Sequence, residues 1–398
     1  LEACALRIAL QLDGTVLPIQ GPPGTGKTWT AAKLILALVR AGRRVGVTAM
    51  SHAVIDNLVR RVVALAASEG TPLRALLKAE PPDPHPAITY TASADEAEAR
   101  VRHVDLLGAT AWQWAREGMA ASVDVLVIDE AGQMCLADAI SVIHAAASLV
   151  LVGDPQQLEQ PIQGTHPDGV GVSVLQHVLG EAQTIAPERG LFLDATHRLH
   201  PTICAYISEQ FYEGRLVPGP HAARQGLTTA PLPAPGLYYL PVTHRGNQNH
   251  SDEEAAAVAD LIARCLAGGT WTDDRGTSHP LTASDVLVVA PYNAHVAALR
   301  AALATRGLAA VPVGTVDKFQ GREAVISIYS MATSLPEDAP RGLGFLYDRH
   351  RLDVATSRGR CATVLVASPA LLRPICNTPV HLQLASGLAR FVELAHQI

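Results

Sequence analysis

The sequence predicts an α/β fold, in which parallel strands and helices alternate through two domains. Short apolar segments rich in β-branched residues, such as Val123–Asp129, are typical of strands buried on both faces. Longer helical stretches separate these segments, and strands that alternate with helices form parallel sheets. The 398 residues fit two or three domains of ordinary size. We place the boundary near residue 190, which gives domains 1–189 and 190–398.

Both halves of the chain repeat this alternation. In the first half, a strand at Val16–Gln20 leads through a glycine-rich turn into a helix from Lys27 to Ala41. The proline- and alanine-rich stretch Glu80–Asp95 indicates a small insertion at about 68–104, and Val217–Gly236 is a second stretch rich in proline and glycine. The other strands are expected at Arg44–Thr48, Leu149–Val152, Asp285–Ala290, Val325–Tyr329 and Ala362–Ala367, and the other helices at Ala53–Ala67, Asp252–Leu266, up to Arg306 and near Asp353.

Composition excludes several classes of protein. A net charge of −6 is unlike the strongly basic chains that bind nucleic acid through overall charge. The six cysteines show no C-x-x-C spacing, which argues against a zinc ribbon, and they are too few for a disulfide scaffold. No run of 18 apolar residues and no signal peptide is visible, so we expect a cytoplasmic protein without membrane contact. The chain begins at Leu1 in mid-pattern, which suggests one region of a longer protein.

The segment Gly21–Thr28 reads GPPGTGKT and matches the phosphate-binding pattern G-x-x-x-x-G-K-[ST] at every position. It lies between an expected strand and an expected helix, which is the context that such a loop requires. Glycines let backbone N–H groups approach phosphates, and the helix N-terminus favours an anion. Lys27 is expected to reach the β- and γ-phosphates, and the Thr28 hydroxyl to bind Mg²⁺. We therefore expect ATP and Mg²⁺ as ligands, held by Gly24, Thr25, Gly26, Lys27 and Thr28.

Two further apolar strands end in polar groups. The strand Val123–Asp129 ends at Asp129 and Glu130, which are expected to hold Mg²⁺ and to polarise the attacking water, respectively. The strand at Leu149–Val152 runs into the sequence GDPQQ, where the carboxamide of Gln157 can sense the γ-phosphate. For the acidic pair alone, a solvated turn is the alternative interpretation, and the preceding phosphate loop argues against it.

The second half contains two arginines in polar turns that suit the same chemistry. Arg198 lies within the sequence DATHRLHP, and Arg358 lies between an expected helix and an expected strand. An arginine that meets transition-state charge on the γ-phosphate accelerates hydrolysis by roughly 10³–10⁵-fold. Two such residues in the second domain would imply a nucleotide site split between the domains, closing on ATP and opening after hydrolysis. A surface salt bridge is the alternative interpretation for each arginine.

Seven blocks in order resemble those of the superfamily 1B helicases, in the group that contains the up-frameshift RNA helicases and the replication nuclease-helicases. They read GPPGTGKT, DEAGQ, GDPQQL, THRLHP, APYNA, VDKFQGRE and VATSRGR, and they extend from about Thr15 to Leu371. The resemblance implies two RecA-like domains with the nucleotide in the cleft between them. It implies catalytic roles for Glu130, Gln157, Arg198 and Arg358, nucleotide contacts for Gln133, His197 and Glu323, and strand contacts for Ser51, His52, Thr110, Tyr292 and Thr315.

The sequence departs from the family pattern at several places. His197 stands where the family has a tyrosine that stacks on adenine, so we expect a histidine to stack there. The sequence AMSH at Ala49–His52 replaces the family's Ala-Pro-Ser-Asn. The region from Leu65 to Val104 is too short for the family's large accessory β-barrel, which weakens the case for strand separation but not for ATP hydrolysis or translocation.

The leading prediction is an ATP-driven helicase or translocase on single strands, with 5′→3′ polarity implied by the resemblance. DNA is preferred over RNA as the partner because the composition resembles that of bacterial proteins. Aromatic residues make up 4% of the chain, so we expect contacts mostly to the phosphate backbone. The alternatives are a motor module with a fused or associated nuclease, and an ATP-switched clamp that does not unwind. The stacking candidates are Trp112, Trp114, Phe319 and Tyr292, and simple packing is the alternative for both tryptophans.

Overall fold

The computed structural model describes residues 2–159, 167, 169–319 and 321–398, and the chain forms two compact units. The first unit comprises Leu1–Pro155 and Glu159–Asp194, and the second comprises Gln156–Leu158 and Ala195–Ile398. Each unit has its own parallel sheet with flanking helices, which confirms the predicted pair of RecA-like α/β domains. In the described ranges, no helix is long and apolar enough to cross a lipid bilayer.

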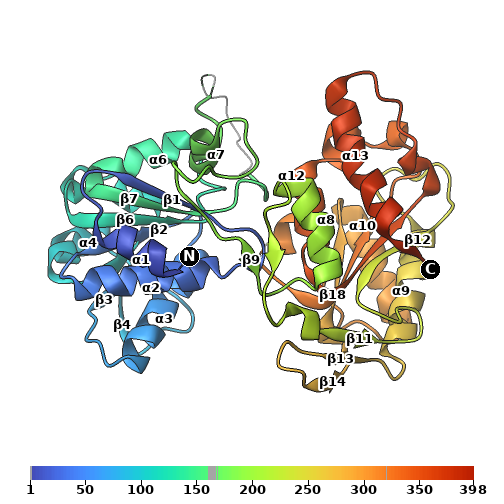
Figure 1. Cartoon of the computed structure of the whole chain (residues 1–398), viewed down its shortest axis with the longest axis horizontal. Helices are drawn as coiled ribbons and strands as arrows, with labels where there is room; N and C mark the ends of the chain where they lie inside the picture. The colour runs from blue at the N-terminus through green and yellow to red at the C-terminus, as the bar shows by residue number, and fades with distance from the viewer. Residues whose placement is uncertain (1, 160–166, 168, 320) are drawn as a thin grey trace. The chain divides into compact units, whose positions relative to one another are not determined.

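The first unit is built on an eight-stranded parallel sheet in the order β4-β3-β5-β2-β6-β7-β1-β8. In the view of Figure 1, α2 and α3 lie below the strands β1, β2, β6 and β7, and α6 and α7 lie above them. The strands are β1 (Val16–Gln20), β2 (Val45–Thr48), β3 (Ala75–Lys78), β4 (Ile88–Thr91), β5 (Leu106–Gly108), β6 (Val123–Asp129), β7 (Ala146–Gly153) and β8 (Leu191–Phe192). The helices are α1 (Glu2–Leu10), α2 (Lys27–Arg40), α3 (His52–Ser68), α4 (Ala94–Arg100), α5 (Ala111–Trp114), α6 (Leu136–Val142) and α7 (Val174–Leu179).

The apolar pattern of the sequence explains these elements. Strand β6 is buried at almost every position, as expected for a central strand covered on both faces. Helix α3 begins at an N-cap, Ser51, whose hydroxyl accepts a hydrogen bond from the Val54 backbone, and it buries a stripe that includes Ile55, Leu58 and Val62. The predicted strand and helix around the glycine-rich turn are confirmed at β1 and α2.

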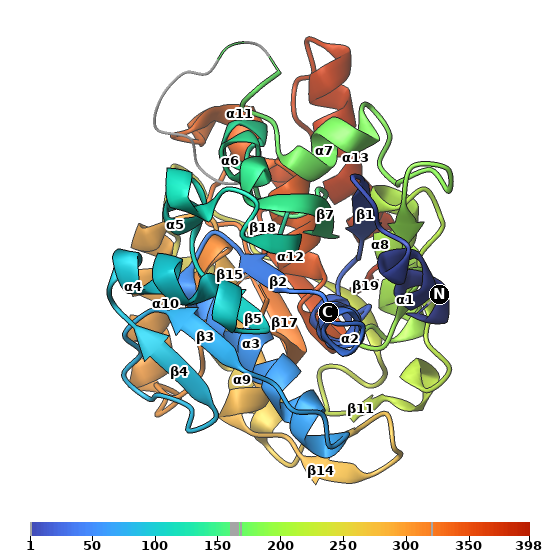
Figure 2. The same cartoon turned by 90° about the vertical axis from the view of Figure 1, so that its left-hand side faces the viewer.

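The segment 68–104 was predicted to be a small insertion. In the structure, its two strands are part of the main sheet and extend it. Strand β3 pairs in parallel with β5, and β4 continues the sheet beyond it (Figure 2). Four of the segment's prolines, Pro81, Pro82, Pro84 and Pro86, lie between the two strands, where no ladder hydrogen bond is needed. Three of the four residues of β3 are buried, so a short apolar strand covers an edge that would otherwise be open.

The second unit contains a six-stranded parallel sheet in the order β16-β15-β17-β18-β12-β19, a three-stranded antiparallel sheet β11-β13-β14, and the pair β10-β9. The strands are β9 (Ala195–Thr196), β10 (Val217–Pro218), β11 (Gly226–Thr228), β12 (Gly236–Pro241), β13 (Thr270–Thr272), β14 (Ser278–Pro280), β15 (Val286–Ala290), β16 (Val313–Thr315), β17 (Ala324–Ser330), β18 (Gly359–Ala367) and β19 (His396–Gln397). The helices are α8 (Pro201–Phe211), α9 (Asp252–Leu266), α10 (Asn293–Thr305), α11 (Gly342–Leu346), α12 (Arg349–Thr356) and α13 (Pro379–Leu394).

A buried chain of polar side chains fixes the carboxyl ends of β15 and β17 in the second unit. The Ser251 backbone N–H donates to His295 Nδ1 at 3.3 Å, so the neutral ring carries its proton on Nε2, 2.7 Å from Ser330 Oγ. The Ser330 hydroxyl donates to Glu254 Oε2 at 2.6 Å, and His244 Nε2 lies 2.9 Å from Glu254 Oε1. The side chains of His244, Glu254 and His295 are fully buried. A buried polar group without a hydrogen-bond partner is costly, so each of these side chains needs its partner.

Substituting Gly46 tests the packing of the first sheet. An added Cβ would lie 2.6 Å from Trp114 Cη2 and 2.8 Å from Leu126 Cδ1, so we expect Gly46→Ala to lower the free energy of unfolding by about 1–3 kcal/mol. Urea unfolding measures the change. Gly236→Ala is the matched control, because an added Cβ at that strand glycine meets no atom within 4 Å. Equal stability of both variants would contradict the close contact at Gly46.

The buried histidine predicts a pH dependence of stability. Burial lowers the pKa of His295 from 6.5 to about 3. Between these values the unfolded chain binds a proton that the folded chain does not, so stability falls as the pH is lowered from about 6.5. The slope contributed by one group is at most about 1.4 kcal/mol per pH unit. We expect His295→Gln to flatten this dependence in urea unfolding between pH 7 and 4.5, and the exposed control His221→Gln to leave it unchanged.

Candidate nucleotide and nucleic-acid site

The phosphate-loop motif lies between β1 and α2, as its sequence requires. Gly24 and Gly26 adopt φ values of 75° and 81°, a left-handed conformation that suits glycine. Lys27 folds back over the loop, with Nζ 2.6 Å from the Gly21 carbonyl oxygen. Thr25 Oγ1 donates to the Pro22 carbonyl at 2.8 Å and closes the turn. The loop is therefore ordered by its own hydrogen bonds, with helix α2 beginning at Lys27.

Three loops meet at the carboxyl ends of the neighbouring strands β6, β7 and β1. The Gly21 N–H donates to the Gly153 carbonyl at 2.8 Å, and the Ala131 N–H donates to the Val152 carbonyl at 2.8 Å. A Cβ on Gly132 would lie 2.3 Å from the Asp154 carbonyl oxygen. The backbone thus joins the phosphate loop, the DEAGQ loop and the GDPQQ loop directly. Sequence reasoning did not select Gly132 or Gly153. The signal in the sequence is that Gly132 follows the acidic pair after β6, and that Gly153 ends β7 directly before Asp154.

Asp129 is 3% exposed at the end of β6, where its Oδ1 accepts a hydrogen bond from the Glu130 backbone at 3.0 Å. Burial raises the pKa of the Asp129 carboxyl to about 7, the Glu130 charge adds to the rise, and the Lys27 ammonium opposes it. Glu130 itself adopts φ 52°, which is uncommon for a residue with a side chain. The chain therefore leaves the extended conformation of β6 directly after Asp129.

The donor set fits a magnesium nucleotide. Mg²⁺ prefers oxygen ligands, and it commonly binds through one or two protein oxygens together with phosphate and water. A buried carboxylate at Asp129, with a raised pKa, is stabilised in its charged form by a cation. Thr28, in the first turn of α2, is the second protein oxygen that the motif supplies. When bound, Mg²⁺ would neutralise charge on the phosphates.

In the second unit, two predicted nucleotide residues contact each other. Arg198 Nε lies 2.7 Å from Glu323 Oε2, and Arg198 Nη1 lies 3.5 Å from the Ser357 carbonyl oxygen. The turn that carries Arg198 is fixed by the Gln225 side chain, which donates to the Arg198 carbonyl at 2.8 Å. Positions from three separate sequence blocks therefore gather at one place in this unit.

Arg358, the second predicted arginine finger, is 1% exposed, and its side chain is engaged within the second unit. Its Nε donates to the Val354 carbonyl at 2.7 Å, and Nη2 donates to Ser357 Oγ at 2.9 Å. Nη1 lies 3.3 Å from the Arg322 carbonyl oxygen. A contact of Arg358 with a phosphate would require an exchange of these hydrogen bonds.

The remaining predicted nucleotide residues lie in three different loops. His197 packs against the turn at Gly219, where an added Cβ would lie 2.9 Å from His197 Nδ1. The Gln133 backbone N–H donates to the Glu130 carbonyl at 2.8 Å, which holds Gln133 in the loop after β6. Gln157 is 4% exposed and follows β7. Gln320, within the VDKFQGRE block, lies outside the described residues.

Two of the predicted strand-binding loops border a single pocket of about 500 Å³ in the first unit. Ala49 and Met50 follow β2, and Thr110 precedes α5, on which Trp112 is 90% exposed. Ser51 and His52 begin α3 beside this pocket without lining it. The complete lining is Ala49, Met50, Thr110, Ala111, Trp112, Ala115, Asp138 and Ser141.

The aromatic candidates for base stacking divide into exposed and buried side chains. Trp114 is fully buried and donates through Nε1 to the Val47 and Ala109 carbonyls at 3.2 and 3.0 Å. Phe319 is 1% exposed and packs against Gly314. Tyr292, at the start of α10, is 8% exposed and lies against Phe345. Trp112 alone among the four presents most of its surface to solvent.

The predicted strand residues of the second unit follow two adjacent strands. Tyr292 comes after β15, and Thr315 ends β16. These strands pair with Ala290 opposite Thr315, so both loops leave the sheet at the same edge. The structure therefore places Tyr292 and Thr315 in neighbouring loops.

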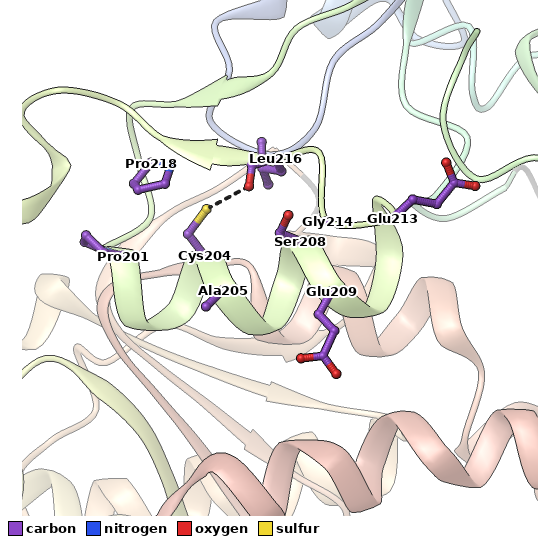
Figure 3. Close-up of a pocket in the computed structure, with 9 residues that line it drawn as sticks. All are labelled: Pro201, Cys204, Ala205, Ser208, Glu209, Glu213, Gly214, Leu216 and Pro218. Carbon is purple, nitrogen blue, oxygen red and sulfur yellow. Dashed lines mark hydrogen bonds between the residues drawn. The ribbon is translucent and has the colours of Figure 1, made fainter.

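A further pocket of about 510 Å³ lies apart from the predicted site residues (Figure 3). It is bordered by α8 and the segment Leu216–Pro218, and Cys204 Sγ donates to the Leu216 carbonyl across it. The residues that line it include two glutamates, Glu209 and Glu213, and no lysine or arginine. Because phosphate is bound most strongly by cationic donors, this lining does not fit a nucleotide.

Two family models together match most of the chain and meet at residue 170. A family model described as an AAA domain matches residues 170–370, half of the chain, and another with the same description matches residues 3–170. A solved structure of the DUF1998 helicase MrfA bound to DNA has a similar fold. Its TM-score is 0.50 at 10% sequence identity, and the likeness covers 98% of this chain and 51% of that one.

Curated relatives match along most of this chain. The DNA polymerase alpha-associated DNA helicase A of Schizosaccharomyces pombe is 25% identical over 420 residues, covering 85% of this chain and 59% of that protein. The regulator of nonsense transcripts 1 homolog of Drosophila melanogaster is 27% identical over 428 residues, covering 93% of this chain and 34% of that protein. The chain thus spans between a third and three fifths of the length of these relatives. It belongs to the AAA-domain P-loop ATPases, within the superfamily 1B helicases of the up-frameshift group.

Proposed function

We propose that this chain is the motor core of an ATP-dependent helicase or translocase that moves 5′→3′ along single-stranded DNA. The observation that carries the proposal is the backbone junction of the phosphate loop, the DEAGQ loop and the GDPQQ loop at one sheet edge. That junction fixes a phosphate-binding lysine relative to two acidic side chains, which is the arrangement that ATP hydrolysis requires. Lys27 and Thr28 hold the nucleotide and Mg²⁺, Asp129 is the metal ligand, and Glu130 is the base.

In this proposal, ATP lies in the cleft between the two RecA-like domains, and Gln157 senses its γ-phosphate. Arg198 and Arg358 supply positive charge from the second domain, while Glu323 contacts the ribose and His197 stacks on the base. The ion pair between Arg198 and Glu323 supports a shared role, because it holds both side chains at one place without a nucleotide. Binding and hydrolysis alternately close and open the cleft, which moves the strand.

The strand contacts are the loops that carry Ser51, His52 and Thr110 in the first domain, and Tyr292 and Thr315 in the second. The pocket beside Met50 and Thr110 supports this proposal, since the exposed Trp112 offers a stacking surface at its border. The preference for DNA draws on the composition and on the S. pombe relative, which is named as a DNA helicase. An RNA strand is the competing partner, as the name of the Drosophila relative suggests.

An ATP-switched clamp that does not unwind is a second candidate function. The observation that favours it is the segment 68–104, whose strands β3 and β4 extend the sheet and whose helix α4 follows them, instead of forming an accessory domain. A strand-displacement assay on a duplex with a single-stranded 5′ tail separates the two candidates. ATP-dependent displacement supports the helicase, whereas ATP-dependent binding without displacement supports the clamp.

The first test is ATP hydrolysis with single-stranded DNA or RNA of equal length at one salt concentration. We expect DNA to stimulate turnover, and Lys27→Ala to abolish it because the β- and γ-phosphates lose their ammonium contact. Lys33→Ala is the matched control, since Lys33 lies on the same helix and pairs with Glu2 at 2.5 Å. Near-normal turnover of Lys27→Ala, or no response of the wild type to either nucleic acid, would overturn the proposal.

The split nucleotide site is tested at Arg198. We expect Arg198→Ala to retain ATP binding but to lower kcat by roughly 10³-fold or more, because the transition state loses a charge contact from the second domain. Nucleotide binding is measured by fluorescence titration, and turnover by phosphate release. Arg390→Ala is the control, as Arg390 is likewise held by a glutamate, Glu209, at 2.8 Å. If kcat of Arg198→Ala equals that of the control, Arg198 is only the structural partner of Glu323.

A further inference from the structure

Helix α11 (Gly342–Leu346; labelled in Figure 2) and the residue before it contain an arginine–aromatic pair outside the seven sequence blocks. The segment is firmly anchored in the second unit: Leu346 and Tyr347 are 2% and 3% exposed, and the Tyr347 hydroxyl donates to the Leu371 carbonyl at 2.6 Å. Arg341 precedes the helix and is exposed, while Phe345 is half-buried. The ring of Phe345 is therefore held in place by the packing of its neighbours.

Two guanidinium groups lie close to the Phe345 ring. The Arg341 Cζ is 3.8 Å from the ring centroid, and the Arg351 Cζ is 4.3 Å from it. Both distances are well within the range of a cation–π attraction, which is worth about 0.5–1 kcal/mol at an exposed site. The ring therefore reduces the freedom of Arg341 before any partner arrives, and less entropy is lost on binding.

The charges at this place do not balance. Arg351 forms an ion pair with Asp317 at 3.2 Å, but among the described residues no carboxylate lies within ion-pair distance of Arg341. Two like charges at one ring repel each other, and a single carboxylate compensates only one of them. The cluster of Arg341, Phe345, Arg351 and Asp317 therefore has one surplus positive charge, which is suited to an anion.

The cluster also connects the two loops that we propose to bind the strand in this unit. The Tyr292 ring, after β15, lies 5.6 Å from the Phe345 ring at an interplanar angle of 36°. Asp317, two residues beyond Thr315 of β16, holds Arg351. Since Ala290 and Thr315 are paired at the same sheet edge, the surplus cation lies beside both loops.

We propose that Arg341, positioned by Phe345, contacts a backbone phosphate of the single strand bound at the loops after β15 and β16. The inference rests on the proposed function and adds a contact that its sequence motifs do not contain. A guanidinium binds phosphate with charge-assisted hydrogen bonds and without regard to base identity. Phe345 is a positioning residue, because it acts through Arg341.

The test is the salt dependence of binding to a fluorescent oligothymidylate, measured by anisotropy on the full chain. One phosphate contact contributes about 0.7 to the slope of log K against log salt for a single strand. We expect Arg341→Ala to flatten the slope by about 0.7. If the variant and the wild type bind equally at 1 M salt, this change corresponds to about fivefold weaker binding of the variant at 0.1 M salt. Arg306→Ala is the control, since Arg306 is exposed and already paired with Asp260 at 3.1 Å.

A double-mutant cycle tests the positioning role of Phe345. We expect Phe345→Leu to weaken binding, Phe345→Tyr to restore it, and Phe345→Leu to have little further effect when Arg341 is already alanine. Equal losses from Phe345→Leu with and without Arg341 would overturn the positioning role. A slope for Arg341→Ala equal to that of the control would overturn the phosphate contact, even while the wild type binds DNA. A wild type that binds no single strand would instead overturn the proposed function itself.

Discussion

The close approach of two glycine backbones at the carboxyl ends of β6 and β7 determines the geometry of the candidate nucleotide site. A Cβ on Gly153 would lie 2.6 Å from the backbone nitrogens of Ala131 and Gly132, so neither loop could hold its position with a larger residue. Backbone contacts vary less than contacts between long side chains, which lose rotamer entropy when they are fixed. The distance from the phosphate loop to Asp129 is consequently set by the sheet itself.

In the second unit, hydrogen bonds between buried side chains, and not backbone contacts, hold the loops in place. The hydrogen-bonded chain through His244, Glu254, Ser330 and His295 fixes the ends of β15 and β17. A buried carboxylate is tolerated because its oxygens are satisfied, and the Ala332 N–H adds another donor to Glu254 at 2.9 Å. The loop that carries Tyr292 is thereby attached to the core of its own unit, because His295 lies three residues beyond Tyr292.

Much of the fold could be predicted because local pattern and burial agree. Strand β6 and helix α9 have the predicted bounds, Val123–Asp129 and Asp252–Leu266, since an unbroken apolar run and a capped amphipathic helix leave few alternatives. Which of the two tryptophans is buried could not be predicted, because Trp112 and Trp114 lie on one short helix and differ only in the side that they face. The hydrogen bonds of Arg358 depend on carbonyls at Val354 and Arg322, which no spacing in the sequence reveals. The strands β3 and β4 were obscured by the prolines between them.

The hydrogen bond from the Lys27 ammonium to the Gly21 carbonyl bears on which ligands the phosphate loop can select. An ammonium has three N–H donors, and this bond uses one of them, so Nζ is held over the loop while donors remain for a ligand. The carbonyl oxygen is neutral and does not cancel the charge of the ammonium, so an arriving phosphate still gains the attraction between opposite charges. A neutral oxygen lacks that attraction, and the loop therefore discriminates by the charge of the incoming group more than by its shape.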